Sequence, residues 1–223
     1  MKRALACTER WPDTAALGAV YSYEGIFWAL LRDARAVAEN SQALRRIAAN
    51  QPVWTGLADI RAGKALMLQG KWQEGSVYLR KGIAFAKRVG LFVLLRSHKL
   101  DEAEFLASQG QIGDSLALLD EAIADKEYAH LRTQALRQRA NLLADSGAQA
   151  LTVEAAYSAA VECARDQGAK YFELLATTSF AQWLKSQNRG AEARAMLSEI
   201  YNCFAEGFDI FALREARSLL DEL

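Results

Sequence analysis

The chain repeats one pattern of residues at an interval of about 39 positions along its whole length. Residues that stop a helical pattern recur at this interval, at Pro12, Gln51, Gly90, Ala129, Gly168 and Gly207. A second set of stops lies about half an interval later, at Arg32-Asp33, Gly70-Lys71, Gly110-Gln111, Ser146-Gly147 and Asn188-Arg189. Two stops in each interval predict a pair of helices per repeat. Repeat chains of this kind usually present a binding surface, because each unit packs only on its neighbours.

The composition fits an all-helical chain of 223 residues. Hydrophobic residues make up 52%, enough for a buried core, and only two prolines occur. No run of β-branched residues alternates with a period of two, so strands are not expected. The 27 basic and 27 acidic residues cancel, which leaves no strong field to attract nucleic acid or an anionic membrane. We therefore expect neither as a partner.

Cysteine usage and the N-terminus indicate a cytoplasmic protein. Cys7, Cys163 and Cys203 are far apart and form no C-x-x-C motif, which argues against a disulfide framework and a zinc site. No apolar run approaches the roughly 20 residues that span a bilayer. The N-terminal segment reaches Glu9 before the apolar core of a signal peptide could form.

The predicted fold class is an all-α, tetratricopeptide-like helix-turn-helix superhelix, an α-solenoid of about five helix pairs in one domain, 1–223. The expected parts are an orphan helix at 1–10, units at 12–50, 51–89, 90–127, 128–167 and 168–206, and a capping helix at 208–223. Because the sequence opens halfway through a repeat, its first face should be apolar. We expect either that upstream sequence has been removed or that this end pairs with another molecule.

Small residues recur at matching places inside the units. Gly63, Gly75 and Gly82 have the same spacing as Ala103, Ser115 and Ala122 one unit later. Small side chains let two paired helices approach closely, and the large residues between them fill the remaining space. This packing is similar to that of the tetratricopeptide repeat (TPR), although that repeat has a shorter period of about 34 residues.

The last third of the chain carries a more specific pattern. It includes Ala164-Arg165-Asp166-Gln167-Gly168, Glu206-Gly207-Phe208-Asp209 and a short helix ending at Leu219-Leu220-Asp221-Glu222-Leu223. This text resembles the C-terminal TPR-like region of large bacterial multidomain signalling proteins. In those proteins a nucleotide cyclase or DNA-binding domain and a predicted NTPase precede the repeats. The resemblance implies a regulatory repeat region, and it implies neither cyclase nor NTPase activity for this chain.

No set of residues indicates catalysis, a cofactor or a metal. The stretch Ala62-Gly63-Lys64-Ala65 lacks the Ser or Thr of a phosphate-binding loop. His98 and Glu102 have helical i,i+4 spacing, and we expect them to form a solvated ion pair. No G-x-S-x-G motif occurs. The sequence therefore predicts a protein that is not an enzyme.

Two binding surfaces are predicted for a peptide or partner protein. In helix-pair solenoids the first helices line the concave groove, and the positions beside their small contact residues select Ser22, Lys64, Glu104, Arg137, Asn141, Thr178 and Gln182. The second surface is the N-terminal edge, where Leu5, Trp11 and Leu17 could support a homodimer. The alternative function is a small-molecule sensor domain of a bacterial signalling or transcription-regulating system.

Overall fold

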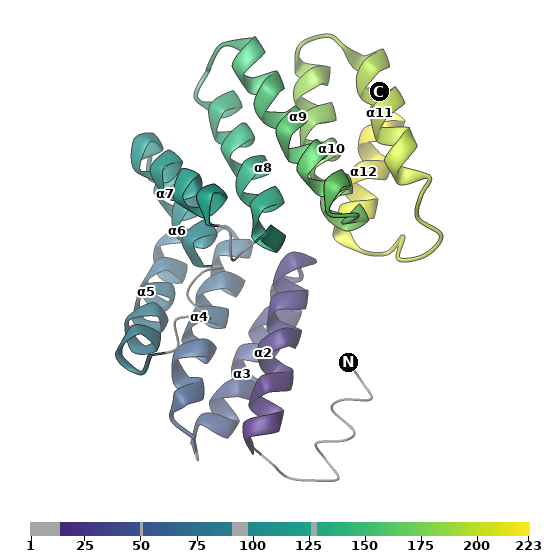
Figure 1. Cartoon of the computed structure of the whole chain (residues 1–223). Helices are drawn as coiled ribbons and strands as arrows, with labels where there is room; N and C mark the ends of the chain where they lie inside the picture. Colours follow the sequence, from purple (N-terminus) through teal and green to yellow (C-terminus); the bar gives the residue numbers. More distant parts are fainter. Residues whose placement is uncertain (1–13, 50, 91–97, 126–128) are drawn as a thin grey trace. The chain divides into compact units, whose positions relative to one another are not determined.

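The computed structural model describes residues 14–49, 51–90, 98–125 and 129–223 (Figure 1). These residues form eleven helices and no strand. The predicted orphan helix at 1–10 lies outside the described residues, as do Leu5 and Trp11. The chain divides into two compact units, Met1–His98 and Lys99–Leu223, here called the N-terminal and C-terminal units. The single continuous domain stays a prediction.

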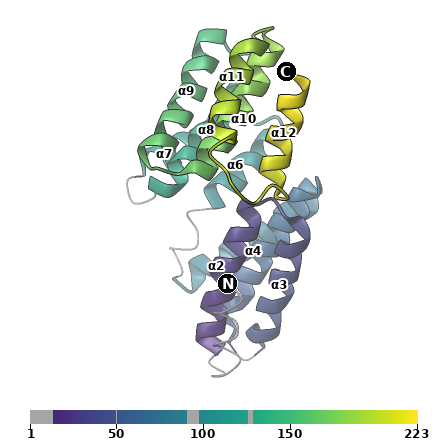
Figure 2. The same ribbon diagram turned by 90° about the vertical axis from the view of Figure 1, so that its right-hand side faces the viewer.

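Each unit is a stack of helix pairs. The N-terminal unit contains α2 (Thr14–Leu30), α3 (Ala34–Ala48), α4 (Val53–Leu68) and α5 (Trp72–Arg88). From His98 onward the chain forms α6 (His98–Ser108), α7 (Ile112–Ala124), α8 (Ala129–Asp145), α9 (Ala150–Asp166), α10 (Lys170–Ser186), α11 (Gly190–Tyr201) and α12 (Phe211–Glu222). In the N-terminal unit the first helices α2 and α4 touch, and in the C-terminal unit the first helices α8 and α10 touch (Figure 2).

The turns inside the pairs share one backbone geometry, and this explains the repeat of stop residues. Gly70 has a φ of +77°, which favours glycine because no Cβ is present to clash. Its N–H donates to the carbonyl of Met67, and the N–H of Lys71 donates to that of Leu66, both at 2.9 Å. This pair of bonds is the Schellman motif, which satisfies the last carbonyls of a helix. The same two bonds recur at Gly110 and, with a non-glycine residue, at Asn188.

Close backbone contact holds α4 against α5, as the small residues predicted. A Cβ added to Gly63 would lie 2.7 Å from the carbonyl oxygen of Gly75, and one added to Gly82 would lie 2.5 Å from that of Gly56. In the next helix pair, α6 and α7, a serine replaces the glycine at the contact and forms a hydrogen bond across it. There the buried Ser115 Oγ donates to the carbonyl of Ala103 at 2.8 Å. In these two pairs the helices therefore pack at distances that larger side chains would not permit.

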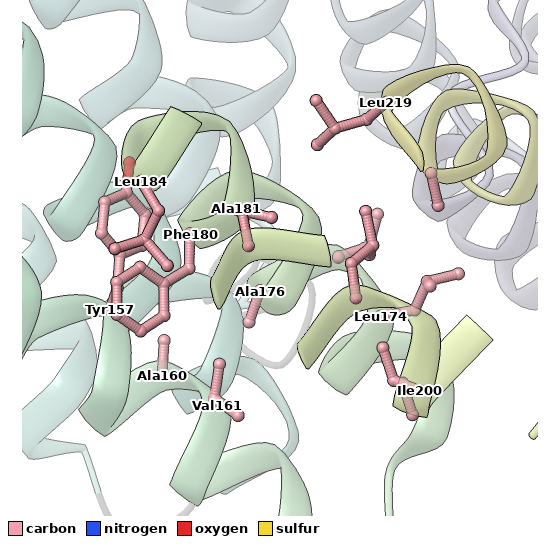
Figure 3. Close-up of a cluster of buried hydrophobic side chains, with 14 of the residues drawn as sticks. Tyr157, Ala160, Val161, Leu174, Ala176, Phe180, Ala181, Leu184, Ile200 and Leu219 are labelled. Carbon is pink, nitrogen blue, oxygen red and sulfur yellow. The ribbon is translucent and has the colours of Figure 1, made fainter. Parts of the chain in front are cut away.

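The largest core cluster lies in the C-terminal unit and joins α8 to α12. Tyr157 from α9 and Phe180 from α10 stack with ring centroids 5.3 Å apart (Figure 3). Ile200 of α11 and Leu219 of α12 extend the cluster toward the chain end. The opposite side of α12 carries polar and charged residues, as expected for a capping helix, and those exposed are Arg214, Glu215, Arg217, Ser218, Asp221 and Glu222.

A buried carboxylate ties α9 to α10. Glu173 is only 3% exposed. Its Oε1 accepts from Arg165 Nε at 2.7 Å, and its Oε2 accepts from Lys170 Nζ at 2.9 Å. Burial alone raises the pKa of this carboxyl group, but the hydrogen bonds from the two cations outweigh it, so the pKa lies below its ordinary value of 4.5.

The Glu173 clamp predicts acid sensitivity. Because its pKa is depressed in the folded state, the stabilisation is complete above pH 4.5 and is lost as the pH falls through the folded-state pKa. Glu173→Gln should cost about 1 to 2 kcal/mol at pH 7 and flatten the loss of stability between about pH 5 and pH 3. Urea unfolding at several pH values measures both effects. Glu206→Gln, at an exposed position, is the control for the same change in charge. An equally steep acid loss in Glu173→Gln would contradict the assignment.

Candidate partner-binding surface

Four of the seven predicted groove residues lie on the adjoining helices α8 and α10, and three of them are open to solvent at least in part. Arg137 and Asn141 are on α8 and are half-buried, whereas Gln182 is on α10 and is exposed. The spacing of Arg137 and Asn141 places them one turn apart on the same face of the helix. With Ser179, which the structure adds, they form what we call the α8–α10 surface, and the buried Gln134 supports it from beneath.

Hydrogen bonds hold the Arg137 guanidinium group in place. Its Nε donates to Gln134 Oε1 on the preceding turn at 3.0 Å. Its Nη1 donates to Ser179 Oγ of α10 at 3.3 Å. The positive charge is therefore fixed between the two first helices instead of extending freely into solvent. A positioned guanidinium group loses less conformational entropy when it binds a carboxylate or a carbonyl oxygen.

Asn141 is oriented from below by the aromatic core. Tyr157 OH donates to Asn141 Oδ1 at 2.9 Å. Burial raises the pKa of Tyr157 to about 12, the charge of Asp145 acts in the same direction and that of Arg137 opposes it. The phenol therefore stays protonated and remains a donor at neutral pH. Because the Asn141 oxygen is engaged, its amide group offers Nδ2 hydrogens as donors.

The aromatic floor below the surface is packed and rigid. The rings of Tyr157 and Phe180 are nearly parallel, with an interplanar angle of 11°, and Trp183 lies 6.0 Å from Phe180 between ring centroids. Tyr157 and Phe180 are buried, and Trp183 is half-buried. These side chains contact one another, so they support the polar residues above them.

Two predicted groove residues are corrected by the structure. Ser22 is buried and its Oγ donates to the carbonyl of Gly18 at 2.7 Å. Thr178 is buried as well, and its Oγ1 donates to the carbonyl of Leu174 at 2.8 Å. Both hydroxyl groups bond back to their own helix one turn earlier. Neither is available to a partner in this conformation, and we leave both out of the candidate surface.

The remaining predicted residues lie apart from the α8–α10 surface in the chain. Lys64 is half-buried on α4 of the N-terminal unit, and Glu104 is half-buried on α6. Leu17 is half-buried and packs against a core cluster of Leu44, Ile47, Leu57 and Ala58. It is the one residue of the predicted N-terminal edge that the structure describes, and that edge stays a prediction.

His98 is also placed differently from the expectation. It is 2% exposed at the start of α6, so it does not form a solvated ion pair with Glu102 on the surface. Within the described part of the chain, no three His, Cys, Asp or Glu side chains gather in a group that could hold a metal ion. None of the helices in that part is long and apolar enough to cross a membrane.

Sequence reasoning missed Ser179 and Gln134. Ser179 directly follows Thr178 in the sequence, and it faces α8 where Thr178 turns back to its own helix. Counting along the sequence from a small contact residue selects a position on the helix. The count does not distinguish two consecutive residues, although their side chains point about 100° apart around the helix axis. The signal was the polar run Thr177-Thr178-Ser179 between apolar residues of α10.

Solved structures match the described architecture. A single-substitution variant of a Podosopora anserina protein described as a kinesin light chain with nearly identical TPR-like repeats matches with a TM-score of 0.53 and 14% identity, over 82% of this chain and 92% of that one. A second structure under the same description, without that substitution, has a TM-score of 0.50 and 13% identity, over 92% of this chain and 95% of that one. The fold is a TPR-like α-solenoid. The predicted fold class is thereby confirmed.

The comparisons show the fold of this chain and no role for it. No protein-family model matches the sequence, and no curated protein is detectably similar to it. TPR-like repeats generally mediate protein–protein interaction and are typically non-catalytic. Identities of 14% and 13% carry the fold and nothing more specific. Any partner must therefore be argued from the side chains of this chain.

Proposed function

We propose that this protein is a non-enzymatic interaction module that binds a peptide segment of a partner protein on the α8–α10 surface. The observation that supports this function is the fixed Arg137 guanidinium group, bonded to both first helices at 3.0 and 3.3 Å. Asn141 lies one turn after Arg137 on α8, and Gln182 lies one turn after Ser179 on α10. Carboxamide side chains carry both donors and acceptors, so they match the peptide groups of an extended segment.

The charge of the α8–α10 surface determines which kind of peptide segment fits it. The α8–α10 surface has one cation, Arg137, and its other members are neutral amides and a hydroxyl group. A segment with an Asp or Glu side chain fits best, because its carboxylate can pair with the guanidinium group while neighbouring peptide groups bond to the amides. The rigid aromatic floor reduces the entropic cost of ordering the surface when the segment binds.

The regulatory setting is a further part of the proposal. The resemblance of the last third of the chain to bacterial signalling proteins suggests that the bound segment belongs to a signalling or transcription-regulating system. In such a system the module would recruit or restrain a partner instead of performing chemistry.

A peptide selection tests the proposed site. A random peptide library displayed on phage is panned against the full chain, and a recovered peptide is labelled with fluorescein. Arg137→Glu should weaken its binding 10- to 100-fold, since it replaces an attraction by a repulsion; this corresponds to about 1.4 to 2.7 kcal/mol. Fluorescence anisotropy measures the dissociation constants.

Arg139→Glu is the matched control for this experiment. Arg139 lies on the same helix but bonds to Asp120 of α7, with its Nε 2.7 Å from Oδ1. Its substitution should change peptide binding by less than about 2-fold, because it faces away from the α8–α10 surface. Circular dichroism shows whether either variant is unfolded. Peptides that lack acidic residues and bind Arg137→Glu as tightly as the unaltered chain would sink the proposal.

A further inference from the structure

Asp145 lies one turn beyond the α8–α10 surface on the same helix. It is the last residue of α8 and is exposed, four positions after Asn141, which itself follows Arg137 by four. Residues four apart in a helix are neighbours on its surface. One side of α8 therefore carries a cation, an amide group and an anion, in that order along the helix.

The hydroxyl group of Tyr157 is close to both of these charges. It donates to Asn141 Oδ1 at 2.9 Å, so it lies under the middle of the row. Its pKa is raised to about 12, mainly by burial; the charge of Asp145 also raises the pKa, and the charge of Arg137 lowers it. Because the effect of a charge falls with distance, Arg137 and Asp145 both lie near the group that positions Asn141.

The end of α8 is negative. Its last turn contains no basic residue, and the carbonyl groups at a helix C-terminus carry a partial negative charge that adds to the charge of Asp145. On α10 the basic residue of the last turn is Lys185, but its Nζ lies 2.6 Å from Oε2 of Glu222, so that charge is already balanced. The end of α8 therefore attracts a cation from a partner, whereas Arg137 attracts an anion.

The distance along α8 sets the spacing of the two charges in a bound segment. Arg137 and Asp145 are eight positions apart, which is about 12 Å at 1.5 Å per residue. An extended chain advances about 3.3 Å per residue, so four residues cover about 13 Å. Residues i and i+4 of an extended chain also point to the same side. Separations of two or six residues, about 7 or 20 Å, do not match the helix.

We propose that the segment bound on the α8–α10 surface is extended and carries two opposite charges four residues apart, an Asp or Glu that pairs with Arg137 and a Lys or Arg that pairs with Asp145. This inference rests on the proposed function and adds the second charge and the spacing. Asn141 lies between the two ion pairs, where its Nδ2 donates to a backbone carbonyl group of the segment.

The second ion pair serves mainly for selection. Ion pairs that are open to solvent contribute little to affinity, because water screens them and the side chains lose freedom. A misplaced like charge is nevertheless unfavourable, and it weakens the binding of the wrong partner. Asp145 therefore repels segments that are acidic throughout, which Arg137 alone would accept.

Charge reversal at Asp145 tests this second pair. Peptides recovered from the phage library on the full chain should carry an acidic and a basic residue four positions apart. Replacing the basic residue of such a peptide by Glu should weaken its binding about 5- to 10-fold, and Asp145→Lys should return the altered peptide to within about 3-fold of the original affinity. Fluorescence anisotropy measures the dissociation constants. Asp145→Lys should remain folded, because a cation is favourable at a helix C-terminus.

Asp166→Lys is the matched control, since Asp166 is the exposed last residue of α9. The same change in charge there should alter the binding of either peptide by less than about 2-fold. Peptides that require Arg137 but bind equally well without their basic residue overturn this inference and leave the proposed function standing. Opposite charges recovered eight positions apart would indicate a helical segment and overturn the extended one. Peptides that bind Arg137→Glu and Asp145→Lys as tightly as the unaltered chain overturn the inference and the proposed function together.

Discussion

Replacing Gly82 by leucine is expected to lower the free energy of unfolding of the N-terminal unit by about 3 kcal/mol or more. A Cβ at this position would lie 2.5 Å from the carbonyl oxygen of Gly56 and 2.9 Å from the backbone nitrogen of Ile60. Backbone atoms of a packed helix cannot move aside as the end of a flexible side chain can. The substitution must therefore push α5 away from α4 and open the core between them. Urea unfolding followed by circular dichroism measures the loss.

Gly113→Ala is the control for the change in helix propensity when a glycine in a helix is replaced. Gly113 lies in the first turn of α7, and a Cβ added there meets no atom within 4 Å. Since alanine favours helix more than glycine does, this variant should be neutral or more stable by up to about 1 kcal/mol. Equal losses in Gly82→Leu and Gly113→Ala would show that helix propensity, and not close packing, explains the repeated spacing of small residues within the chain.

Replacing Phe180 by alanine is expected to destabilise the C-terminal unit by about 3 to 5 kcal/mol. Phe180 is buried in the core cluster of the C-terminal unit, where it stacks on Tyr157 (Figure 3). The centroids of the Phe180 and Trp183 rings lie 6.0 Å apart. The variant loses the transfer free energy of the ring and the aromatic pairing, and it leaves a cavity that helices fixed at both ends fill only in part. Thermal or urea unfolding measures the loss.

Phe180→Ala also tests whether the core supports the α8–α10 surface. Without Phe180 the Tyr157 ring loses its stacking partner, and its hydroxyl group no longer holds Asn141 in one orientation. Peptide binding should therefore weaken even at temperatures at which the variant is folded. Leu151→Ala, at an exposed position of α9, should change stability by less than about 0.5 kcal/mol. A fully stable Phe180→Ala would contradict the description of this core.

The helix pairs could be predicted from the sequence because their stops have a local cause. At Gly70 and Gly110 the backbone adopts a left-handed conformation with φ of 77° and 75°, and glycine at such a place is visible in the sequence. Arg32 and Asn188 adopt similar angles without glycine, and only the interval of the repeat located them. A regular period therefore carried information that no single residue provides.

The site was harder to predict, because it depends on the direction of side chains. Ser22 and Thr178 have polar side chains at the selected positions, yet both hydroxyl groups bond to carbonyl oxygens of their own helices. The i,i+4 spacing of His98 and Glu102 predicted a solvated ion pair, but His98 is buried. A helical period places a residue on a face within about one position. Whether its polar atom reaches solvent depends on the neighbouring helix, which lies far away in the sequence.

The most direct test of the account is to locate a selected peptide on the protein by nuclear magnetic resonance. Labelled with ¹⁵N, the chain of 24.6 kDa gives separate signals for side-chain amide groups and for arginine Nε–H. If the α8–α10 surface binds the peptide, the largest changes will occur at Arg137 Nε–H and at the side-chain amides of Asn141 and Gln182. Changes confined to other helices, with these three signals unmoved at saturation, would contradict the proposed function.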